Sequence, residues 1–280
     1  ENQYDLVFLP RNKIGSATKI DTTAFKFWRV TDNKVKTGAA GSGDNAYIYF
    51  IPLDDKIFVR GTVPSGSEKF TIAGADPEPG CSLSVSFFDY CKAHGIAYQN
   101  QNNNCIYRND SSALDNSNLI HTHYSPSLDS IIYWFLKKSI NLYGEALVKT
   151  FAYEKKGFGS TDSGVAIVKD FWKQKGIDEN ELNICDGSGL SPLNRVTTHA
   201  QVEILKYAKT KDWFRYFYDA LPEYNGMKMK SGTIRDVKSF CGYQTAKDGN
   251  EYIFSFIVNN YNGRTSDVVS KMYKVLDNLK

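Results

Sequence analysis

Features that would assign a function directly are scarce in this chain of 280 residues. It has 4 histidines and 5 cysteines, and the absence of any Cys-x-x-Cys pair excludes the usual zinc and thioredoxin-type patterns. No apolar run approaches the length that spans a membrane. The formal net charge of +3 is too close to balance to predict nucleic-acid binding. The chain also begins without Met, so we expect a mature or trimmed form whose signal peptide, if any, is not visible.

The few cysteines leave the cellular compartment open. The first three lie close enough in sequence for one disulfide, and the odd number leaves at least one thiol free. We expect most of them to be buried thiols that act as small hydrophobic residues. The cysteines are Cys81, Cys91, Cys105, Cys185 and Cys241.

What the chain does contain is the composition of a folded protein, 41% hydrophobic and 14% aromatic, at a length that predicts more than one unit. Residues 1 to about 75 predict β structure. Short β-branched and aromatic runs at 47–51, 57–60 and 70–72 are separated there by turn signals rich in Gly, Pro, Asp and Ser.

A boundary between two domains is predicted near residue 118. A helix over about 83–93 follows the β region, and the polar stretch 99–118 predicts a surface loop or domain connection. We therefore expect a β-rich domain with one helix at 1–118 and a second domain at 119–280.

The second domain reads as helices, three consecutive strands and a closing helix. Ser127 is the expected N-cap of a helix whose stripe of Leu128, Ile131, Ile132, Phe135 and Leu136 predicts a buried face. Further helices are predicted at 142–151, 165–175, 201–208 and 268–279, and strands at 227–234, 239–245 and 252–259. The predicted fold class is α+β with an antiparallel meander.

The first of two motifs that suggest chemistry is Ser139-Ile140-Asn141, at a break in the helical pattern. In a turn between two helices, both polar side chains can point into one cleft. Ser139 could then relay a proton, and Asn141 could hydrogen-bond a substrate amide. The alternative is an ordinary Ser/Asn cap at a helix junction, which the motif taken alone favours.

The second motif is Lys230-Ser231-Gly232-Thr233, on a predicted strand. Gly232 has no side chain, so the backbone of a ligand can approach the strand edge and pair with it. Lys230 offers a cation beside a proton relay, and Thr233 offers a hydroxyl for a terminal carboxylate. The alternative, an exposed edge-strand lysine before a turn, is again favoured by the motif alone.

Together the two motifs resemble the Ser-x-Asn and Lys-Thr-Gly motifs of the penicillin-recognising serine acyltransferases. The segment between them, Asp186-Gly187-Ser188-Gly189-Leu190-Ser191-Pro192-Leu193-Asn194, is the strongest marker. With it the chain resembles the class C low-molecular-mass penicillin-binding proteins, the D-alanyl-D-alanine carboxypeptidase/endopeptidase family. An Asn-Leu-x-x-Glu stretch at 141–145, the Gly242-Tyr243 pair, and segments at 44–49, 60–64 and 125–128 extend the resemblance over most of the chain.

The resemblance implies the C-terminal part of a transpeptidase/β-lactamase-like domain, with helices on an antiparallel sheet, plus β-rich inserted domains. The implied activity is cleavage of the terminal D-alanine, or of a cross-bridge, from peptidoglycan stem peptides through an acylated serine. The partners would be stem peptides and β-lactams. The protein would act in the periplasm or elsewhere outside the cytoplasm, and it would need no metal or organic cofactor.

The resemblance also assigns roles to residues. Catalytic roles fall to Ser139 as proton relay, Asn141 as substrate-amide ligand and Lys230 as cation. Ser231, Gly232 and Thr233 would bind substrate. A structural turn that shapes the floor of the cleft would comprise Asp186, Gly187, Ser188, Gly189 and Ser191.

Two departures from the family matter. Ser231 stands where the family usually has Thr, a change that keeps the hydroxyl. The Ser-x-x-Lys nucleophile lies before the inserted domain in the family, and the chain offers no convincing match, so the nucleophile is unknown. We expect that segment to be missing. Its loss would leave an open sheet edge and apolar surface, from which we predict pairing with the segment or with another copy of the chain.

Several other patterns in the sequence are weaker candidates for a site. Ser16-Ala17-Thr18-Lys19 matches Ser-x-x-Lys literally, but its flanks are poor helix formers. Lys36-Thr37-Gly38 is followed by an apparent loop rather than a strand edge. His121 and His123 predict a surface strand far more than a metal site, and His199 has no evident Ser/Asp partner in the sequence.

Three functions remain open from the sequence. The first is an enzyme of this family whose nucleophile lies elsewhere. The second is a binding or scaffolding protein that kept the cleft and lost catalysis. The third and weakest is a β-lactamase, which the inserted β domain disfavours.

Overall fold

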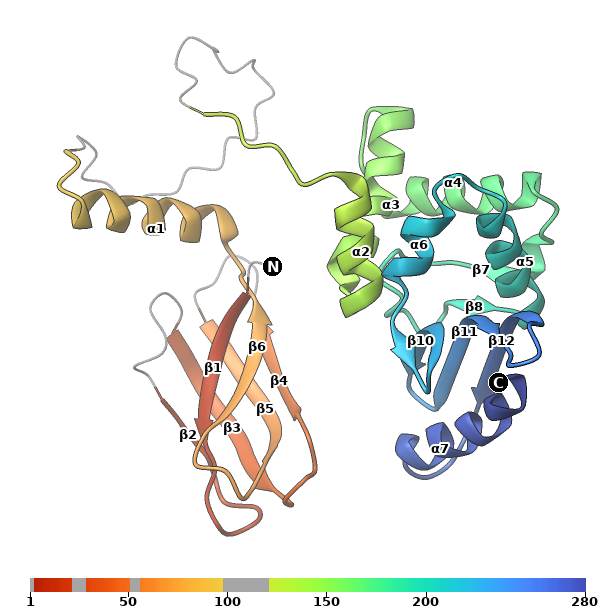
Figure 1. Ribbon diagram of the computed structural model, residues 1–280. Helices are drawn as coiled ribbons and strands as arrows, with labels where there is room; N and C mark the ends of the chain where they lie inside the picture. Colours follow the sequence, from red (N-terminus) through yellow and green to blue (C-terminus); the bar gives the residue numbers. More distant parts are fainter. Residues whose placement is uncertain (1–2, 22–28, 51–55, 98–120) are drawn as a thin grey trace. The chain divides into compact units, whose positions relative to one another are not determined.

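The computed structural model describes residues 3–21, 29–50, 56–97 and 121–280. The chain divides into two compact units, Glu1–Ser117 and Asn118–Lys280 (Figure 1). No helix in the described ranges is both long and apolar enough to cross a bilayer. The predicted polar loop at 99–118 and Cys105 lie outside the described residues.

The first unit is a pair of facing three-stranded sheets. One has the antiparallel order β2-β1-β6, and the other has the order β3-β5-β4 with β3 parallel to β5. Alternate side chains of both sheets point inward and form one core, with Leu6 and Phe8 from the first sheet and Val35, Ile57 and Val59 from the second. The strands are β1 (Gln3–Leu9), β2 (Lys19–Ile20), β3 (Arg29–Gly38), β4 (Asn45–Phe50), β5 (Lys56–Pro64) and β6 (Phe70–Ala75).

This unit confirms the predicted β-rich character of the N-terminal part, with more strands than were located one by one. Helix α1 (Pro79–Ala93) follows β6 and begins with Pro at its first turn, where the missing N–H costs nothing. The helix starts four residues before the predicted one. Pro79 and Gly80 ordinarily indicate a turn, but here they form the first turn of the helix.

The second unit is built on an antiparallel sheet of order β12-β11-β10-β9. Its strands are β9 (Glu223–Tyr224), β10 (Met227–Ile234), β11 (Val237–Thr245) and β12 (Glu251–Asn259), and a separate small ladder pairs β7 (Leu182–Asn183) with β8 (Arg195–Val196). The helices are α2 (Leu128–Lys138), α3 (Asn141–Lys156), α4 (Thr161–Gln174), α5 (Thr198–Lys209), α6 (Phe214–Ala220) and α7 (Thr265–Leu276). Two 3₁₀ turns are η3 (Glu179–Glu181) and η4 (Asp277–Leu279).

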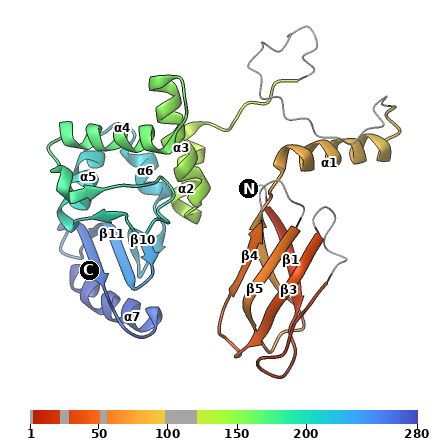
Figure 2. The same cartoon turned by 180° about the vertical axis from the view of Figure 1, so that it is seen from behind.

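Helices cover both faces of this sheet (Figures 1 and 2). Met229 and Phe240 face α7, where they pack with Met272 in one apolar cluster. Tyr243 faces the other way, packs with Leu205 of α5, and donates a hydrogen bond of 2.8 Å from its hydroxyl to the Leu205 carbonyl oxygen. The predicted α+β class with helices on an antiparallel meander is therefore confirmed.

Two sequence expectations for this unit are wrong. The α2 stripe is not fully buried: Leu128 is 62% exposed, and the other four residues of the stripe are half-buried. Leu136 packs against the cluster beneath α5 and α6. His121 and His123 lie on an exposed segment without regular structure, rather than on a strand, because no neighbouring strand in the described chain pairs with it.

The cysteines match the expected pattern of pairing, but of those in the described ranges only Cys91 is the buried thiol expected for most of them. Cys81 is in a disulfide, while Cys91, Cys185 and Cys241 are free thiols. Cys91 is buried within α1. The prediction of one disulfide with several free thiols is thus consistent with the described residues.

Candidate active site

The first motif lies at a sharp junction between α2 and α3. Ser139 ends α2 in the left-handed conformation, with φ 54° and ψ 49°, which costs a non-glycine residue about 1–2 kcal/mol. Asn141 is already the first residue of α3. The chain therefore turns within two residues. Ser139 is the C-cap of α2, as the cap alternative predicts, and its side chain is in addition free to contact the second motif.

The end of α2 that carries Ser139 is fixed to the neighbouring helix. Lys137 donates from Nζ to the carbonyl oxygens of Leu221, at 3.1 Å, and Asp219, at 3.3 Å. These carbonyls belong to the C-terminal turn of α6, where a cation also interacts favourably with the helix dipole. The left-handed Ser139 is therefore held by a packed neighbour only two residues away.

The second motif lies on β10, and side-chain alternation divides it between two faces. Met229 faces α7, so Lys230 faces the opposite side, toward the helices that include α2 and α3. Lys230 pairs with Cys241 of β11 across the sheet, and Gly232 pairs with Ser239. Ser231 and Thr233 alternate to the α7 side, and Thr233 is exposed at the strand end.

The structure brings the two motifs into contact. Lys230 donates from Nζ to Ser139 Oγ at 2.7 Å, although the two residues are 91 positions apart. A second Lys230 N–H bonds the Ser231 carbonyl oxygen at 3.1 Å. No carboxylate of the described chain pairs with Lys230. An ammonium without a counter-ion next to a serine hydroxyl is an arrangement that orients the hydroxyl for proton transfer.

The electrostatics of Lys230 follow from its surroundings. Burial lowers its pKa below the ordinary value of 10.5, and the charge of Lys238 adds to this shift, while Cys241 acts in the opposite direction. Burial also raises the pKa of the Cys241 thiol to about 11. Cys241 is therefore protonated at neutral pH, so it is neither a counter-ion for Lys230 nor an activated nucleophile.

Beside this contact the outer edge of β10 is open. β9 pairs only with Met227 and Lys228, so Lys230 to Ile234 have no strand partner on that side among the described residues. Gly232 is exposed, and a Cβ added there would meet only the Ser239 hydroxyl at 2.7 Å. The Asn141 side chain is exposed and makes no hydrogen bond to a described residue. An extended ligand could pair with this edge and reach Asn141, Lys230 and Thr233.

The loop after β7 is organised by one carboxylate. Asp186 accepts hydrogen bonds from the backbone of Gly189, at 2.6 Å, and of Ser191, at 2.8 Å. It also accepts from Ser188 Oγ at 3.1 Å and from Asn194 Nδ2 at 3.2 Å. The Asp-Gly-Ser-Gly-Leu-Ser pattern thus encodes a closed turn around Asp186, and the Ser188 hydroxyl is used inside it.

This loop packs on α3 through two glycines. A Cβ on Gly144 would lie 2.2 Å from the carbonyl oxygen of Gly187, and a Cβ on Gly187 would lie 2.3 Å from that of Gly144. Next to them Glu145 accepts from the Gly187 N–H at 2.9 Å and from the Thr161 hydroxyl. The loop therefore fixes the first turns of α3, which begin at Asn141. We propose that this is how it shapes the site.

The pKa of Asp186 yields a prediction. Burial opposes its ionisation, but the hydrogen bonds from the loop lower its pKa below the ordinary 3.8. Its stabilising effect is therefore complete above that ordinary value and is lost as the pH falls through the lower folded-state pKa. We expect Asp186→Asn to lower the free energy of unfolding at pH 7 by about 2 kcal/mol. In acid, the stability of this variant should fall less steeply than that of wild type, because the amide has no proton to gain.

Urea unfolding at pH 7 and at several acid pH values measures both effects. Asp212→Asn is the matched control, because Asp212 is exposed and makes no hydrogen bond within the described chain. An Asp186→Asn protein with wild-type stability at neutral pH would contradict the role given to this carboxylate.

The geometry can now be compared with known proteins. The model of the D-Ala-D-Ala carboxypeptidase 3 (S13) family matches residues 1–223, most of the chain. The chain belongs to the S13 family. Lys230 lies just beyond the matched residues, so its assignment depends on the contact with Ser139.

Two curated relatives agree with this membership. A D-alanyl-D-alanine carboxypeptidase of Actinomadura sp. (strain R39) is 27% identical over 270 residues, covering 89% of this chain and 49% of the relative. The D-alanyl-D-alanine carboxypeptidase DacB of Haemophilus influenzae is 26% identical over 172 residues, covering 55% and 36%. The chain thus spans half or less of these relatives.

A comparison with solved structures gives the fold. A crystal structure of penicillin binding protein 4 (dacB) from Haemophilus influenzae, complexed with a β-lactam, has a TM-score of 0.74 and 17% identity. It covers 99% of this chain, which in turn covers 68% of that protein. At this identity the likeness shows the shared fold.

The weaker sequence candidates lack the local structure that their proposed roles need. Ser16 follows a turn and Lys19 begins β2, so the two are not one helical turn apart. Thr37 is buried in β3 and accepts a hydrogen bond from the Arg11 N–H. His199 is exposed and contacts Glu181 at 2.9 Å. The nucleophile of this site stays unassigned.

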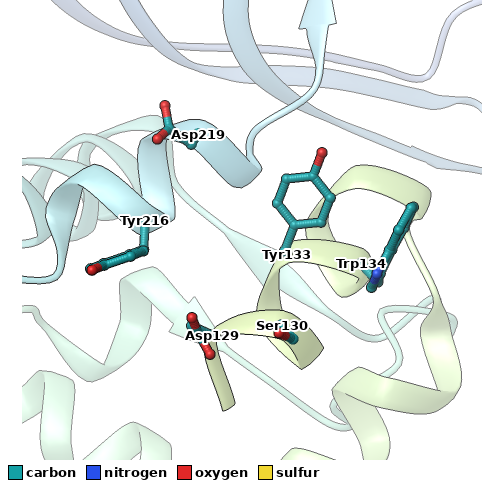
Figure 3. Close-up of a pocket in the computed structure, with 6 residues that line it drawn as sticks. All are labelled: Asp129, Ser130, Tyr133, Trp134, Tyr216 and Asp219. Carbon is teal, nitrogen blue, oxygen red and sulfur yellow. The ribbon is translucent and has the colours of Figure 1, made fainter. Parts of the chain in front are cut away.

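A surface pocket of about 330 Å³ lies between α2 and α6, apart from the site residues (Figure 3). The pocket is lined by Tyr133 and Trp134 from α2 and by Tyr216 and Asp219 from α6. Lys137 already lies 5.6 Å from the Tyr133 ring centroid, and Arg215 lies 4.0 Å from the Asp219 carboxylate. Tyr133 and Asp219 therefore already have cationic neighbours within the chain.

Sequence reasoning missed one residue of the site, Lys238 of β11. It is 8% exposed and donates from Nζ to Thr233 Oγ1 at 2.8 Å. The available signal was its place directly before the predicted strand 239–245, because a tight hairpin after 227–234 puts this residue opposite Thr233.

Proposed function

We propose that this chain forms the proton-relay and substrate-binding part of a serine-type D-alanyl-D-alanine carboxypeptidase or endopeptidase. Its substrates are peptidoglycan stem peptides, and penicillins acylate the same site. The observation that carries the proposal is the 2.7 Å contact between Lys230 Nζ and Ser139 Oγ beside an unpaired strand edge. S13 membership and the names of the curated relatives support this reaction class.

The proposed reaction divides the work among these residues. The substrate pairs with β10, and Asn141 holds an amide of the stem peptide. A serine nucleophile attacks the carbonyl of the penultimate D-alanine, and its proton passes through Ser139 to the leaving amine as the C–N bond breaks. Water then hydrolyses the ester. Lys230 keeps the Ser139 hydroxyl oriented, and Thr233 donates to the terminal carboxylate.

We propose that the nucleophile reaches this site on a segment outside these residues and that the segment pairs with β12. β12 is the outer strand of the sheet, and its free edge has no partner in the described chain. Such an edge, with Phe256 and Ile257 half-buried, invites pairing. The relatives contain more chain than this one spans. Because the proposed substrate is peptidoglycan, the protein would act outside the cytoplasm.

Incubation with benzylpenicillin followed by intact mass measurement tests the proposal. We expect no adduct on the isolated 280-residue chain, because loss of a catalytic serine costs about a millionfold in rate. We expect a stoichiometric adduct on a longer form that carries the Ser-x-x-Lys segment, with slower amide exchange in β12.

Peptide mapping distinguishes the remaining outcomes. An adduct on the isolated chain at Ser16 would overturn the proposed location of the nucleophile. A longer form that folds but takes up no penicillin would support a binding or scaffolding protein. Rapid release of hydrolysed penicillin would instead indicate a β-lactamase.

A further inference from the structure

We propose that Lys238 is a further specificity-determining residue, which makes the Thr233 hydroxyl a fixed donor and supplies the positive charge for a carboxylate at the end of a ligand on β10. The inference builds on the proposed function. It adds a residue to the site and names the ligand group that this residue selects.

The burial of Lys238 is the first argument. Lysine is almost never so buried without a partner, and this residue is 8% exposed. Its Nζ lies 4.8 Å from the centroid of the Phe240 ring, which offers only a weak attraction for a cation. Burial lowers its pKa below 10.5, with no acidic group among the causes. In the described chain this cation has no counter-ion.

The contact with Thr233 is the second argument. An ammonium group has three N–H donors and no acceptor, so Thr233 Oγ1 must accept the 2.8 Å hydrogen bond from Lys238. The Thr233 hydrogen is then left to point elsewhere. Thr233 is exposed, so its hydroxyl is available as a donor to a ligand acceptor. A cation behind the hydroxyl also strengthens that donor.

Lys230 of β10 and Lys238 of β11 together leave an excess of positive charge near the end of β10. Lys230 and Lys238 are close enough for one to lower the pKa of the other, and neither has a carboxylate partner among the described residues. Each donates to a hydroxyl, Lys230 to Ser139 and Lys238 to Thr233. A ligand carboxylate beside Thr233 would compensate this excess charge, whereas an ester or amide there would not.

The test compares ligands that differ only in that charge. Acylation rates are measured on the longer form that carries the Ser-x-x-Lys segment. Benzylpenicillin and its methyl ester are compared for wild type, Lys238→Met and Lys238→Arg. We expect the methionine variant to react roughly 10- to 100-fold more slowly with the free acid but within about threefold of wild type with the ester. Arginine should restore most of the preference for the acid.

A charge-matched control is Lys247→Met, which removes a lysine from the exposed turn at the other end of β11. It should leave both rates unchanged, and thermal unfolding checks that each variant folds. Equal losses for acid and ester, or no loss for either, would overturn the inference while wild-type acylation still upheld the proposed function. A wild type that reacts with neither ligand would remove both.

Discussion

Replacing Lys230 with Met should slow penicillin acylation of the full-length protein by about 100- to 10,000-fold, the range expected when a proton-transfer group is lost. Methionine keeps much of the length of the side chain but removes the ammonium that holds Ser139 Oγ at 2.7 Å. Without it the left-handed Ser139 has no described partner for its hydroxyl. The Ser139 hydroxyl is then still present, but it is no longer oriented for proton transfer.

The same variant should not lose stability. Burial depresses the folded-state pKa of Lys230 below its ordinary value, so the charged form destabilises the folded protein at neutral pH. We therefore expect the melting temperature to equal or exceed that of wild type. The difference should shrink as the pH rises through the folded-state pKa toward 10.5, because wild type then loses the buried charge.

Two further variants separate the contact from its surroundings. Lys228→Met removes a lysine two residues earlier on the same face of β10, where its Nζ lies 5.8 Å from the Tyr218 ring centroid, and should leave acylation within about threefold of wild type. Ser139→Ala should resemble Lys230→Met, and the double variant should be little slower than either, since residues that act as a unit are not additive. Additive losses would contradict the proposed relay.

Much of the fold was predictable because its signals are local. Short apolar strands with turn residues between them and the meander at 227–259 follow directly from side-chain periodicity. The exposure of α2 was not predictable, because a stripe such as Leu128 to Leu136 shows only that a helix can bury one face. What packs on it is a tertiary property.

The site divides in the same way. Ser139 and Lys230 could be chosen from motif and order, but their contact depends on the left-handed turn at Ser139 and on the outward facing of β10. Lys238 was missed because the predicted strand begins at residue 239, which leaves this lysine in the turn, where a lysine ordinarily indicates exposure to solvent. Only the hairpin register, which places it opposite Thr233, reveals it as a buried cation.

Gly144→Ala should lower the free energy of unfolding by about 3 kcal/mol or more, because a methyl group would be forced against backbone rather than against a movable side chain. The added Cβ would lie 2.2 Å from the Gly187 carbonyl oxygen and 3.0 Å from the Phe135 ring. In a unit of this size the melting temperature should fall by roughly 10 °C.

The effect should also reach the site in any molecules that fold. Asn141 begins α3 less than one turn before Gly144, and the Asp186 loop fixes that turn through Gly187 and Glu145. Moving α3 off the loop displaces Asn141 and the Ser139 junction together. Gly187→Ala should act alike, since its Cβ would lie 2.3 Å from the Gly144 carbonyl oxygen.

Ala146→Gly on the same helix is the control for these glycine variants. Ala146 is exposed, so this change should cost only about 1 kcal/mol of helix propensity and leave acylation unaltered. Urea unfolding and penicillin acylation are measured on all three. If Gly144→Ala costs no more than Ala146→Gly, the backbones of α3 and the loop must be free to separate. In that case the loop would not be what positions Asn141.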